Sequence, residues 1–234
     1  MARIYAPEAR KGKEITLSKD QVRHLKVLRL KEGEKFRVFD GQGHEYEAVY
    51  SQKVREGKVL LEKEVKAREE PKVKITLAVA VPKGNRMDFL VEKVSELGVL
   101  NIVPIICSRS VVKPKETKVE RLRRIVIEAA CQSERCIVPT ISEPLPFGEL
   151  LSTIKDYNQA LICHKTGHPL AEEYSDPATV LVIIGPEGDF TQAELDAAKE
   201  AGCTFVSLSP TILRVETAAV AAVSQLIALS ERKR

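Results

Sequence analysis

The pattern of apolar and polar positions differs between the first and the second part of the chain. In the first part, short runs alternate apolar and polar residues, as half-buried strands do. The sequences DGQG (40–43) and EG (56–57) between these runs are typical of turns. The strands expected from this pattern are residues 14–17, 35–40, 44–51 and 57–65.

One helix is expected between the first two of these strands. Ser18 is followed three residues later by Gln21, which is the spacing of a capping box. After them Val22, Leu25 and Leu28 recur at helical spacing. The first region is therefore expected to be a barrel-like binding module with one basic helix. The residues expected to face outward from that helix are Arg23, His24, Lys26 and Arg29.

A charged stretch at 62–72 marks a boundary, and beyond it the apolar runs become longer and richer in β-branched residues. Such runs are typical of strands that are buried on both faces of a parallel sheet. Helical patterns alternate with them, which indicates an α/β domain. Gly98 is placed to end the first helix, and Thr191 with Glu194 forms another capping box. The expected strands are 73–81, 100–106, 158–163, 179–184 and 203–208, and the expected helices are 86–97, 116–134, 191–201 and 215–230.

The composition narrows the class of protein. Apolar residues make up 44% and charged residues 30% of the 234 positions, as in ordinary soluble globular proteins. No apolar run approaches the roughly 20 residues of a membrane helix, and no signal-peptide core is visible, so a cytosolic protein is expected. The five cysteines form no CxxC pair and no metal-ligand spacing with the four histidines. They are expected to be small buried residues, with no metal site.

Charge is unevenly placed along the chain, although the net charge is only +4. Residues 1–31 carry nine cations against three acids, and residues 71–135 carry thirteen against seven. Residues 136–230 carry four cations against twelve acids. A basic front half joined to an acidic rear half favours a phosphate-binding surface attached to a catalytic module. The alternative is that these charges only solvate helix faces.

Two of the expected strands end in unusual loops. The strand at 179–184 runs into GPEGDF (185–190), and the strand at 203–208 runs into SPTILRVETA (209–218). Ligands of open parallel sheets bind beyond the carboxyl ends of the strands, where glycine and proline shape the loops. No dinucleotide fingerprint, Walker A sequence or GxSxG motif is present. Taken alone, a Gly-Pro-x-Gly turn is also an ordinary connection.

The second loop contains two charged residues in apolar surroundings. Arg214 and Glu216 stand among Leu213, Val215 and an Ala-rich helix. Charged residues in such places are normally paired or functional, so neither is expected to be fully solvated. Two readings stay open, a structural Arg214–Glu216 pair or a reactive site.

Taken together, the motifs resemble the RsmE family, the SPOUT-superfamily enzymes that methylate N3 of a uridine in 16S ribosomal RNA of the small subunit. The resemblance implies a PUA-like RNA-binding β-barrel at 1–68 and a SPOUT methyltransferase domain at 72–234. The second domain would be an α/β fold with a parallel sheet and a C-terminal trefoil knot. S-adenosylmethionine would be the cofactor and the protein a homodimer, with helix 215–230 either at the dimer surface or in the core. The segments that carry the resemblance are 24–48, 83–99, 104–113, 124–139, 185–195 and 207–218.

The resemblance also assigns roles to individual residues. Arg214 would stabilise the anion of the target uridine, and Glu216 would orient Arg214 or accept the N3 proton. Arg135 would hold the target phosphate or base, unless it only interacts with the carbonyls that end a helix. Contacts with RNA phosphates are expected from Arg3, Arg23, His24 and Arg29. Contacts with the cofactor are expected from Leu161, Ile162, Cys163, His164, Gly185, Pro186, Glu187, Gly188, Leu208, Ser209, Pro210, Ile212, Leu213 and Thr217, although His164 could equally be a plain surface residue.

Two positions depart from the family pattern. Asp189 stands where a second glycine usually follows Pro-Glu-Gly, and Ser209 stands where a glycine usually precedes proline. If the backbone needs a positive φ at these positions, Asp tolerates it better than Ser. The departures leave an alternative open, an RNA-binding ribosome-assembly factor with a degenerate methyltransferase site. A nucleotide- or sugar-handling enzyme is disfavoured because phosphate-binding motifs are absent.

Overall fold

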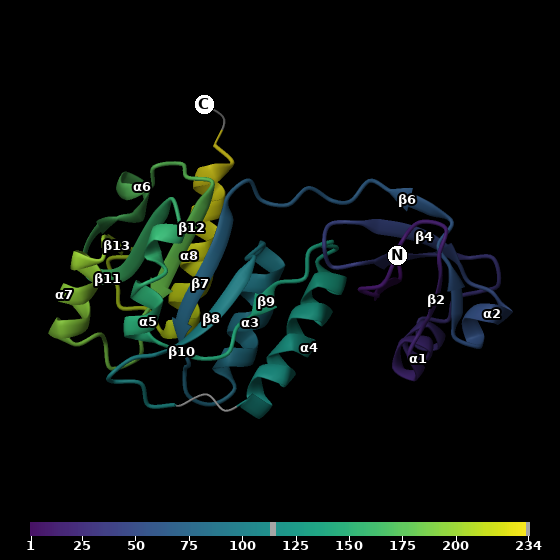
Figure 1. The fold of residues 1–234 in the computed structure, drawn as a ribbon, viewed down its shortest axis with the longest axis horizontal. Coiled ribbons are helices and arrows are strands. Elements are labelled where there is room, and N and C mark those ends of the chain that lie inside the picture. The colour runs from purple at the N-terminus through teal and green to yellow at the C-terminus, as the bar shows by residue number, and fades with distance from the viewer. Residues whose placement is uncertain (113–115, 233–234) are drawn as a thin grey trace. The chain divides into compact units, whose positions relative to one another are not determined.

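The computed structural model describes residues 1–112 and 116–232, which fall into two compact units (Figure 1). Unit 1 comprises Met1–Glu70 together with Ala130–Val138, and unit 2 comprises Pro71–Ala129 together with Pro139–Arg234. The sequence predicted a single division at 68–72, with residues 130–138 in the second domain. In the structure Ala130 and Cys136 pack against Phe39 in a buried cluster of unit 1. The domain bounds stay a prediction.

Unit 1 is built from two small sheets around an apolar core. The larger sheet has the order β1-β3-β4-β6, in which β1 and β3 are parallel and the other pairs antiparallel. The smaller sheet pairs β2 with β5. Phe36, Val38 and Ala48 project into the core, which is why residues alternate between buried and partly exposed along β3 and β4. The elements are β1 (Arg3–Tyr5), β2 (Glu14–Thr16), α1 (Lys19–Val27), β3 (Lys35–Phe39), β4 (Glu45–Val49), α2 (Gln52–Arg55), β5 (Lys58–Leu60) and β6 (Lys63–Val65).

Helix α1 begins as its sequence predicts. The Ser18 hydroxyl accepts a hydrogen bond from the backbone amide of Gln21, and the side-chain oxygen of Gln21 accepts one from the backbone amide of Ser18. Leu25 is fully buried, but Leu28 is the C-cap and is half-exposed, so the apolar face is one turn shorter than expected. The helix therefore packs mainly through Leu25 and keeps its basic residues outside.

Unit 2 is an α/β structure whose main sheet is entirely parallel, as predicted. Its order is β10-β8-β7-β12-β11-β13, and β9 pairs with the first two residues of β8, Asn101 and Ile102. The strands are β7 (Lys74–Ala80), β8 (Asn101–Ile106), β9 (Thr140–Ile141), β10 (Leu145–Pro146), β11 (Gln159–Pro169), β12 (Thr179–Ile184) and β13 (Thr204–Ser207). The helices are α3 (Arg86–Leu97), α4 (Glu116–Gln132), α5 (Phe147–Leu151), the 3-10 turn η1 (Ile154–Asp156), α6 (Leu170–Glu173), α7 (Gln192–Glu200) and α8 (Val215–Ser230).

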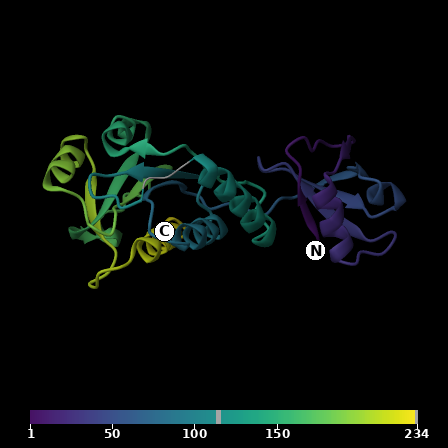
Figure 2. The same ribbon diagram turned by 90° about the horizontal axis from the view of Figure 1, so that it is seen from below.

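Helices cover both faces of this sheet, which explains the long apolar runs in the sequence. Figure 2 shows α5 and α7 on one face and α3 and α8 on the other. On the first face Ile162, Leu181 and Ile183 are buried with Phe147 and Phe190. The predicted helix ends are confirmed. Gly98 ends α3 in the left-handed region at φ 114°, and the Thr191–Glu194 capping box begins α7.

The order of the last elements differs from a simple progression along the sheet. Strand β12 lies between β7 and β11, although β11 precedes it in the chain, and β13 lies on the far side of β11. Helix α8 then returns to pack on α3, β7 and β12. This return across the middle of the sheet is the region in which the resemblance predicts a trefoil knot. The knot stays a prediction.

No helix within residues 1–112 and 116–232 combines the length and the apolar character needed to cross a membrane.

Candidate functional site

Three neighbouring strands of unit 2 end at the same edge of the sheet. Cys163 of β11 is the register partner of Ile184 on β12 and of Val206 on β13. Because the strands are parallel, the loops that follow them leave from one edge. The structure therefore brings the predicted cofactor loops together. Leu161 and Ile162 are exceptions, since both are fully buried within β11, between β12 and β13.

The end of β11 departs from regular pairing. Its register against β13 shifts between Cys163 and His168, so the residues between them bulge out of the ladder. The His164 ring is nearly buried and lies edge-on to Phe205. Its Nε2 lies 3.4 Å from Oδ2 of Asp189 in the loop after β12. His164 is therefore part of the contact between two loops rather than a plain surface residue.

A single arginine connects the two loops that the sequence singled out. Arg86 begins α3, and its guanidinium lies 3.6 Å from Oε1 of Glu187 and 3.7 Å from Oε1 of Glu216. The amide of Lys83 also donates to Glu187 Oε1 at 3.2 Å. Glu216 is buried, and its Oε2 accepts no hydrogen bond from any described residue. A buried carboxylate oxygen without a partner is costly unless a ligand supplies one.

The loop after β12 is also held from the side of β8. Arg109 donates to the carbonyl oxygens of Gly188 at 3.0 Å and Phe190 at 3.4 Å. The Glu194 carboxylate accepts a hydrogen bond from the Ser108 amide at 2.7 Å and another from the Thr191 amide. Burial alone would raise the pKa of Glu194, but these hydrogen bonds outweigh it and lower the pKa from its ordinary value of 4.5. The loop after β12 is therefore held both by Arg86 of α3 and by Ser108 and Arg109, which follow β8.

The Glu194→Ala variant is expected to lower the free energy of unfolding by about 1 kcal/mol at neutral pH, because it removes a capping box. The native carboxyl has the lower pKa, so its contribution is complete above the ordinary value of 4.5 and is lost as pH falls through the lowered value. The difference between wild type and variant should therefore shrink in acid. Urea unfolding at pH 7 and in acid measures it. Glu200→Ala, an exposed change at the other end of α7, is the matched control. An equal difference at both pH values would contradict this account.

The two departures from the family pattern cause no backbone conflict. Asp189 adopts φ 61°, the left-handed region that glycine occupies easily and that Asp tolerates. Its Oδ1 accepts a hydrogen bond from the next amide, of Phe190, at 2.9 Å. Among the described residues Ser209 is not one of those with positive φ, and its Oγ accepts from the Thr211 amide at 3.2 Å. A local serine turn thus shapes the loop where the family usually has glycine.

Arg214 and Glu216 do not form the pair that one reading of the sequence proposed. Glu216 contacts Arg86 instead, while Arg214 is the N-cap of α8 and makes no side-chain cap hydrogen bond. Glu216 is buried, as expected of a residue that is not fully solvated, whereas Arg214 is exposed. A guanidinium that projects from the N-terminus of a helix, near its buried Glu216, is free to bind an anion.

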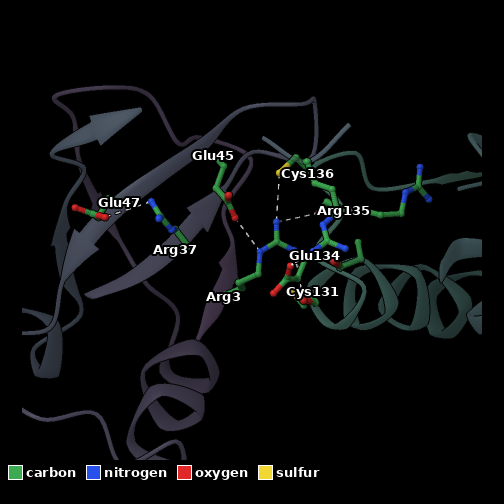
Figure 3. Close-up of polar contacts among 10 residues, drawn as sticks. Arg3, Arg37, Glu45, Glu47, Cys131, Glu134, Arg135 and Cys136 are labelled. Atoms are coloured by element: carbon green, nitrogen blue, oxygen red, sulfur yellow. Dashed lines mark hydrogen bonds and ion pairs between the residues drawn. The ribbon is translucent and has the colours of Figure 1, made fainter. Parts of the chain in front are cut away.

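Arg3 is placed differently from its predicted role. Figure 3 shows its guanidinium between β4 and the end of α4, both within unit 1. It donates to Glu45 at 2.8 Å and to the carbonyl oxygens of Ala130 at 3.0 Å and Arg135 at 3.2 Å. Arg3 is only 6% exposed, so its predicted contact with RNA phosphates is wrong. It satisfies the carbonyls that end α4, which is a structural role.

Arg135 also lies in unit 1, whereas Arg214 and Glu216 belong to unit 2. It is 5% exposed, and its Nε and Nη2 lie 2.8 and 2.7 Å from one carboxylate oxygen of Glu70. Its guanidinium is buried against an acid, which does not favour the predicted contact with the target phosphate or base. Of the two readings of Arg135 the structural one fits better, with Glu70 as its partner.

The other three predicted RNA-binding residues are exposed on the surface of unit 1. Arg23, His24 and Arg29 are all exposed on or just after α1, as predicted. Arg29 has φ 55°, so the chain turns there and presents its side chain at the end of the helix. Their binding to RNA is an expectation that the geometry permits.

Three of the cysteines are poor nucleophiles because they are buried. All five are free, and burial raises the pKa of Cys107 and Cys163 to about 12 and that of Cys203 to about 11. A thiol with such a pKa is protonated at neutral pH and unreactive. Within the described residues no group of His, Cys, Asp and Glu side chains is arranged to hold a metal ion.

Sequence reasoning missed Arg86 and Arg109. Both lie within segments that carried the family resemblance, 83–99 and 104–113, but neither was singled out there. A signal for Arg86 was available. A cation in the first turn of a helix opposes the helix dipole, so its presence there implies acidic partners elsewhere in the fold.

Comparison with known proteins identifies relatives along the whole chain. Residues 68–227 match the RNA methyltransferase domain family, and residues 17–63 match the RNA methyltransferase PUA domain family. The chain is 35% identical to ribosomal RNA small subunit methyltransferase E of Synechocystis, over 97% of this chain and 77% of the relative. It is 34% identical to the Aquifex aeolicus protein of the same name, over 96% and 98%. The Neisseria gonorrhoeae protein of that name, solved bound to S-adenosyl methionine, superposes with a TM-score of 0.90 at 34% identity, covering 98% of both chains.

Proposed function

The chain belongs to the ribosomal RNA small subunit methyltransferase E (RsmE) family, and we propose that it transfers a methyl group from S-adenosylmethionine to N3 of a uridine in 16S ribosomal RNA. The observation that carries the proposal is the meeting of three loops at one edge of the parallel sheet, beside the buried Glu216. That edge is where open α/β sheets bind their ligands.

The residues at this edge suit the cofactor. The segments 161–164, 185–188 and 208–213, with Thr217, would hold it through backbone groups and through the apolar side chains of Leu208 and Leu213. The unpartnered Oε2 of Glu216 offers an acceptor in the same place. When bound, S-adenosylmethionine supplies an activated methyl group on its sulfonium.

Methylation of N3 requires residues of the chain to accept its proton and to stabilise the resulting negative charge. N3 of uridine carries a proton at neutral pH, and its removal leaves an anion shared with O2 and O4. Arg214 is exposed and makes no side-chain cap hydrogen bond, so it can donate to these oxygens and stabilise the anion. Glu216, whose Oε2 has no partner among the described residues, would accept the proton. Arg86 would act through Glu187 and Glu216, as a positioning residue.

Unit 1 would bind the RNA backbone. The exposed residues Arg23, His24 and Arg29 form one basic surface on and after α1. Contacts of this kind depend on charge rather than on sequence, so RNA affinity should fall as salt rises. Small-subunit RNA, free or assembled, is the proposed partner, and the cytoplasm is the proposed location because ribosomal subunits are made there.

A second copy of the chain is the other proposed partner. Ile212, at the tip of the loop before α8, is 94% exposed, and Phe89 on α3 is half-exposed. Contact with a second copy would remove both side chains from water, which is favourable in proportion to the apolar area that is buried. A homodimer would cover them and bring the exposed Arg214 into a water-poor environment, where a fixed charge is worth more.

Calorimetric titration with S-adenosylmethionine tests the proposal against the degenerate alternative. Binding with a defined stoichiometry is expected, because Asp189 tolerates its positive φ and Ser209 does not need one. Absence of binding, together with salt-sensitive binding of RNA, would support an assembly factor instead.

A further inference from the structure

Unit 2 contains a cavity that none of the cofactor loops lines. It lies beyond β7 and β8, between the loop 81–85, the start of α3 and one face of α4, and its volume is 220 Å³. Ligand pockets for drug-sized molecules have about 300–1,000 Å³. This cavity is therefore too small for a molecule the size of S-adenosylmethionine and large enough for one flat ring system. A single water takes up about 30 Å³, so it is also more than a hydration site.

The walls of the cavity are apolar and its rim is polar. Met87 on α3 and Leu122 on α4 are each 6% exposed and face the space from opposite sides. At the rim Asp88 and Arg121 form an ion pair, and Asn85 is exposed. Asn85 precedes α3 but makes no side-chain cap hydrogen bond, which leaves its amide available to a ligand. Apolar walls with a few polar groups at the edge are the lining that planar heterocycles require.

The cavity adjoins the proposed reaction site. Asn85 and Met87 line it, and Arg86 between them reaches Glu187 and Glu216. The amide of Lys83, in the same loop, contacts Glu187 as well. The loop 82–86 is thus a wall shared by the cavity on one side and the cofactor loops on the other. A nucleotide in the cavity would be a close neighbour of the nucleotide being methylated.

We propose that this cavity receives one unstacked base of the substrate RNA, from a nucleotide that flanks the target uridine. The inference rests on the proposed function, because N3 lies on the pairing edge of uracil and the target must be unpaired to react. Sequence-specific recognition of RNA generally reads such splayed bases, by apolar contact with the ring and hydrogen bonds to its edge. Met87 and Leu122 supply the apolar contact, and the Asn85 amide, with Asp88 and Arg121, supplies the edge contacts.

The test fills the cavity and removes the base separately. Leu122→Phe extends a ring into the space, and Asn85→Ala removes the free amide while leaving the volume. Glu120→Phe is the matched control, because Glu120 is exposed on the same helix and does not line the cavity. Binding of a small-subunit RNA oligonucleotide is measured by fluorescence anisotropy, with intact RNA and with abasic sites placed in turn at positions flanking the target. S-adenosylmethionine affinity and urea unfolding are measured for each variant.

Leu122→Phe is expected to weaken binding of intact RNA on the order of 10-fold, the usual loss when one base contact is removed. Asn85→Ala should weaken it several-fold, as for one lost hydrogen bond. One abasic position should cost the wild type a similar factor and cost Leu122→Phe nothing further. If Leu122→Phe does not fold, the RNA affinity of Asn85→Ala tests the proposal instead. The assignment would be overturned if both variants bound intact RNA as tightly as the wild type. It would also be overturned if Leu122→Phe lost a further factor of affinity at every abasic position, because no position would then correspond to the cavity. RNA binding is read without methyl transfer, so a failure of the proposed activity is seen separately.

Discussion

Replacing Arg214 with alanine is expected to lower kcat for RNA methylation by about 10²–10³-fold, the usual cost of removing one group that stabilises a developing oxyanion. The structure gives Arg214 no side-chain cap hydrogen bond, and the residue is exposed at the start of α8. Its loss should therefore leave the fold and the cofactor affinity almost unchanged. Single-turnover methylation with saturating S-adenosylmethionine measures the rate, and calorimetry measures the affinity.

Two further variants separate charge from geometry at this position. Arg214→Lys keeps the charge but not the planar fork of donors, so it should recover only part of the rate. Arg232→Ala, just beyond the other end of α8, removes an exposed cation without effect on the site. An Arg214→Ala enzyme with the wild-type rate would refute the role given to Arg214. Loss of cofactor binding in that variant would make Arg214 a cofactor ligand instead.

Gly185→Ala is expected to lower both the stability of the protein and its rate of methyl transfer. A Cβ at Gly185 would lie 2.6 Å from Cε2 and 2.9 Å from Cζ of Phe190. The Phe190 ring cannot yield easily, since it is buried and packs against Phe147 at 5.2 Å between centroids. The backbone of the loop must move instead. Overpacking of this kind costs about 1–3 kcal/mol of stability, and a misplacement of about 1 Å can cost 10²-fold in rate.

Gly148→Ala is the matched control for that substitution. Gly148 lies in α5, and a Cβ there would meet no atom within 4 Å. Alanine favours the helix over glycine by about 0.5–1 kcal/mol, so this variant should be slightly stabilised and fully active. Urea unfolding and cofactor titration of both variants check the pair. Equal cofactor affinity in the two would contradict a role for the Gly185 loop in binding the cofactor.

Most regular strands and helix ends could be predicted because the local sequence and the tertiary packing favour the same secondary structure. Strands buried on both faces need apolar residues at nearly every position, and β7 and β12 have them apart from Lys74, Thr76 and Thr179. The helix caps at Ser18, Gly98 and Thr191 depend only on contacts within a few residues of the chain, so the sequence alone is enough to predict them. Short elements such as β9, β10 and α6 leave no periodicity to read, and they were not anticipated.

Partners of charged residues could not be predicted in the same way. Arg3, Arg135 and Arg23 look alike in the sequence, yet two are buried in unit 1 and one is exposed. The difference depends on which acids and carbonyls the fold brings to them from positions far away in the chain, such as Glu45 and Glu70. For the same reason the sequence suggested Arg214 as a partner of Glu216, whereas the structure places Arg86 there.

The most direct test of the proposed function is to identify the product. The purified protein is incubated with S-adenosylmethionine carrying a labelled methyl group and with small-subunit RNA or subunits that lack the modification. The RNA is then digested to nucleosides and analysed by mass spectrometry. The account predicts labelled 3-methyluridine in wild-type reactions and almost none with Arg214→Ala. Label on another nucleoside, or on the ribose, would contradict it.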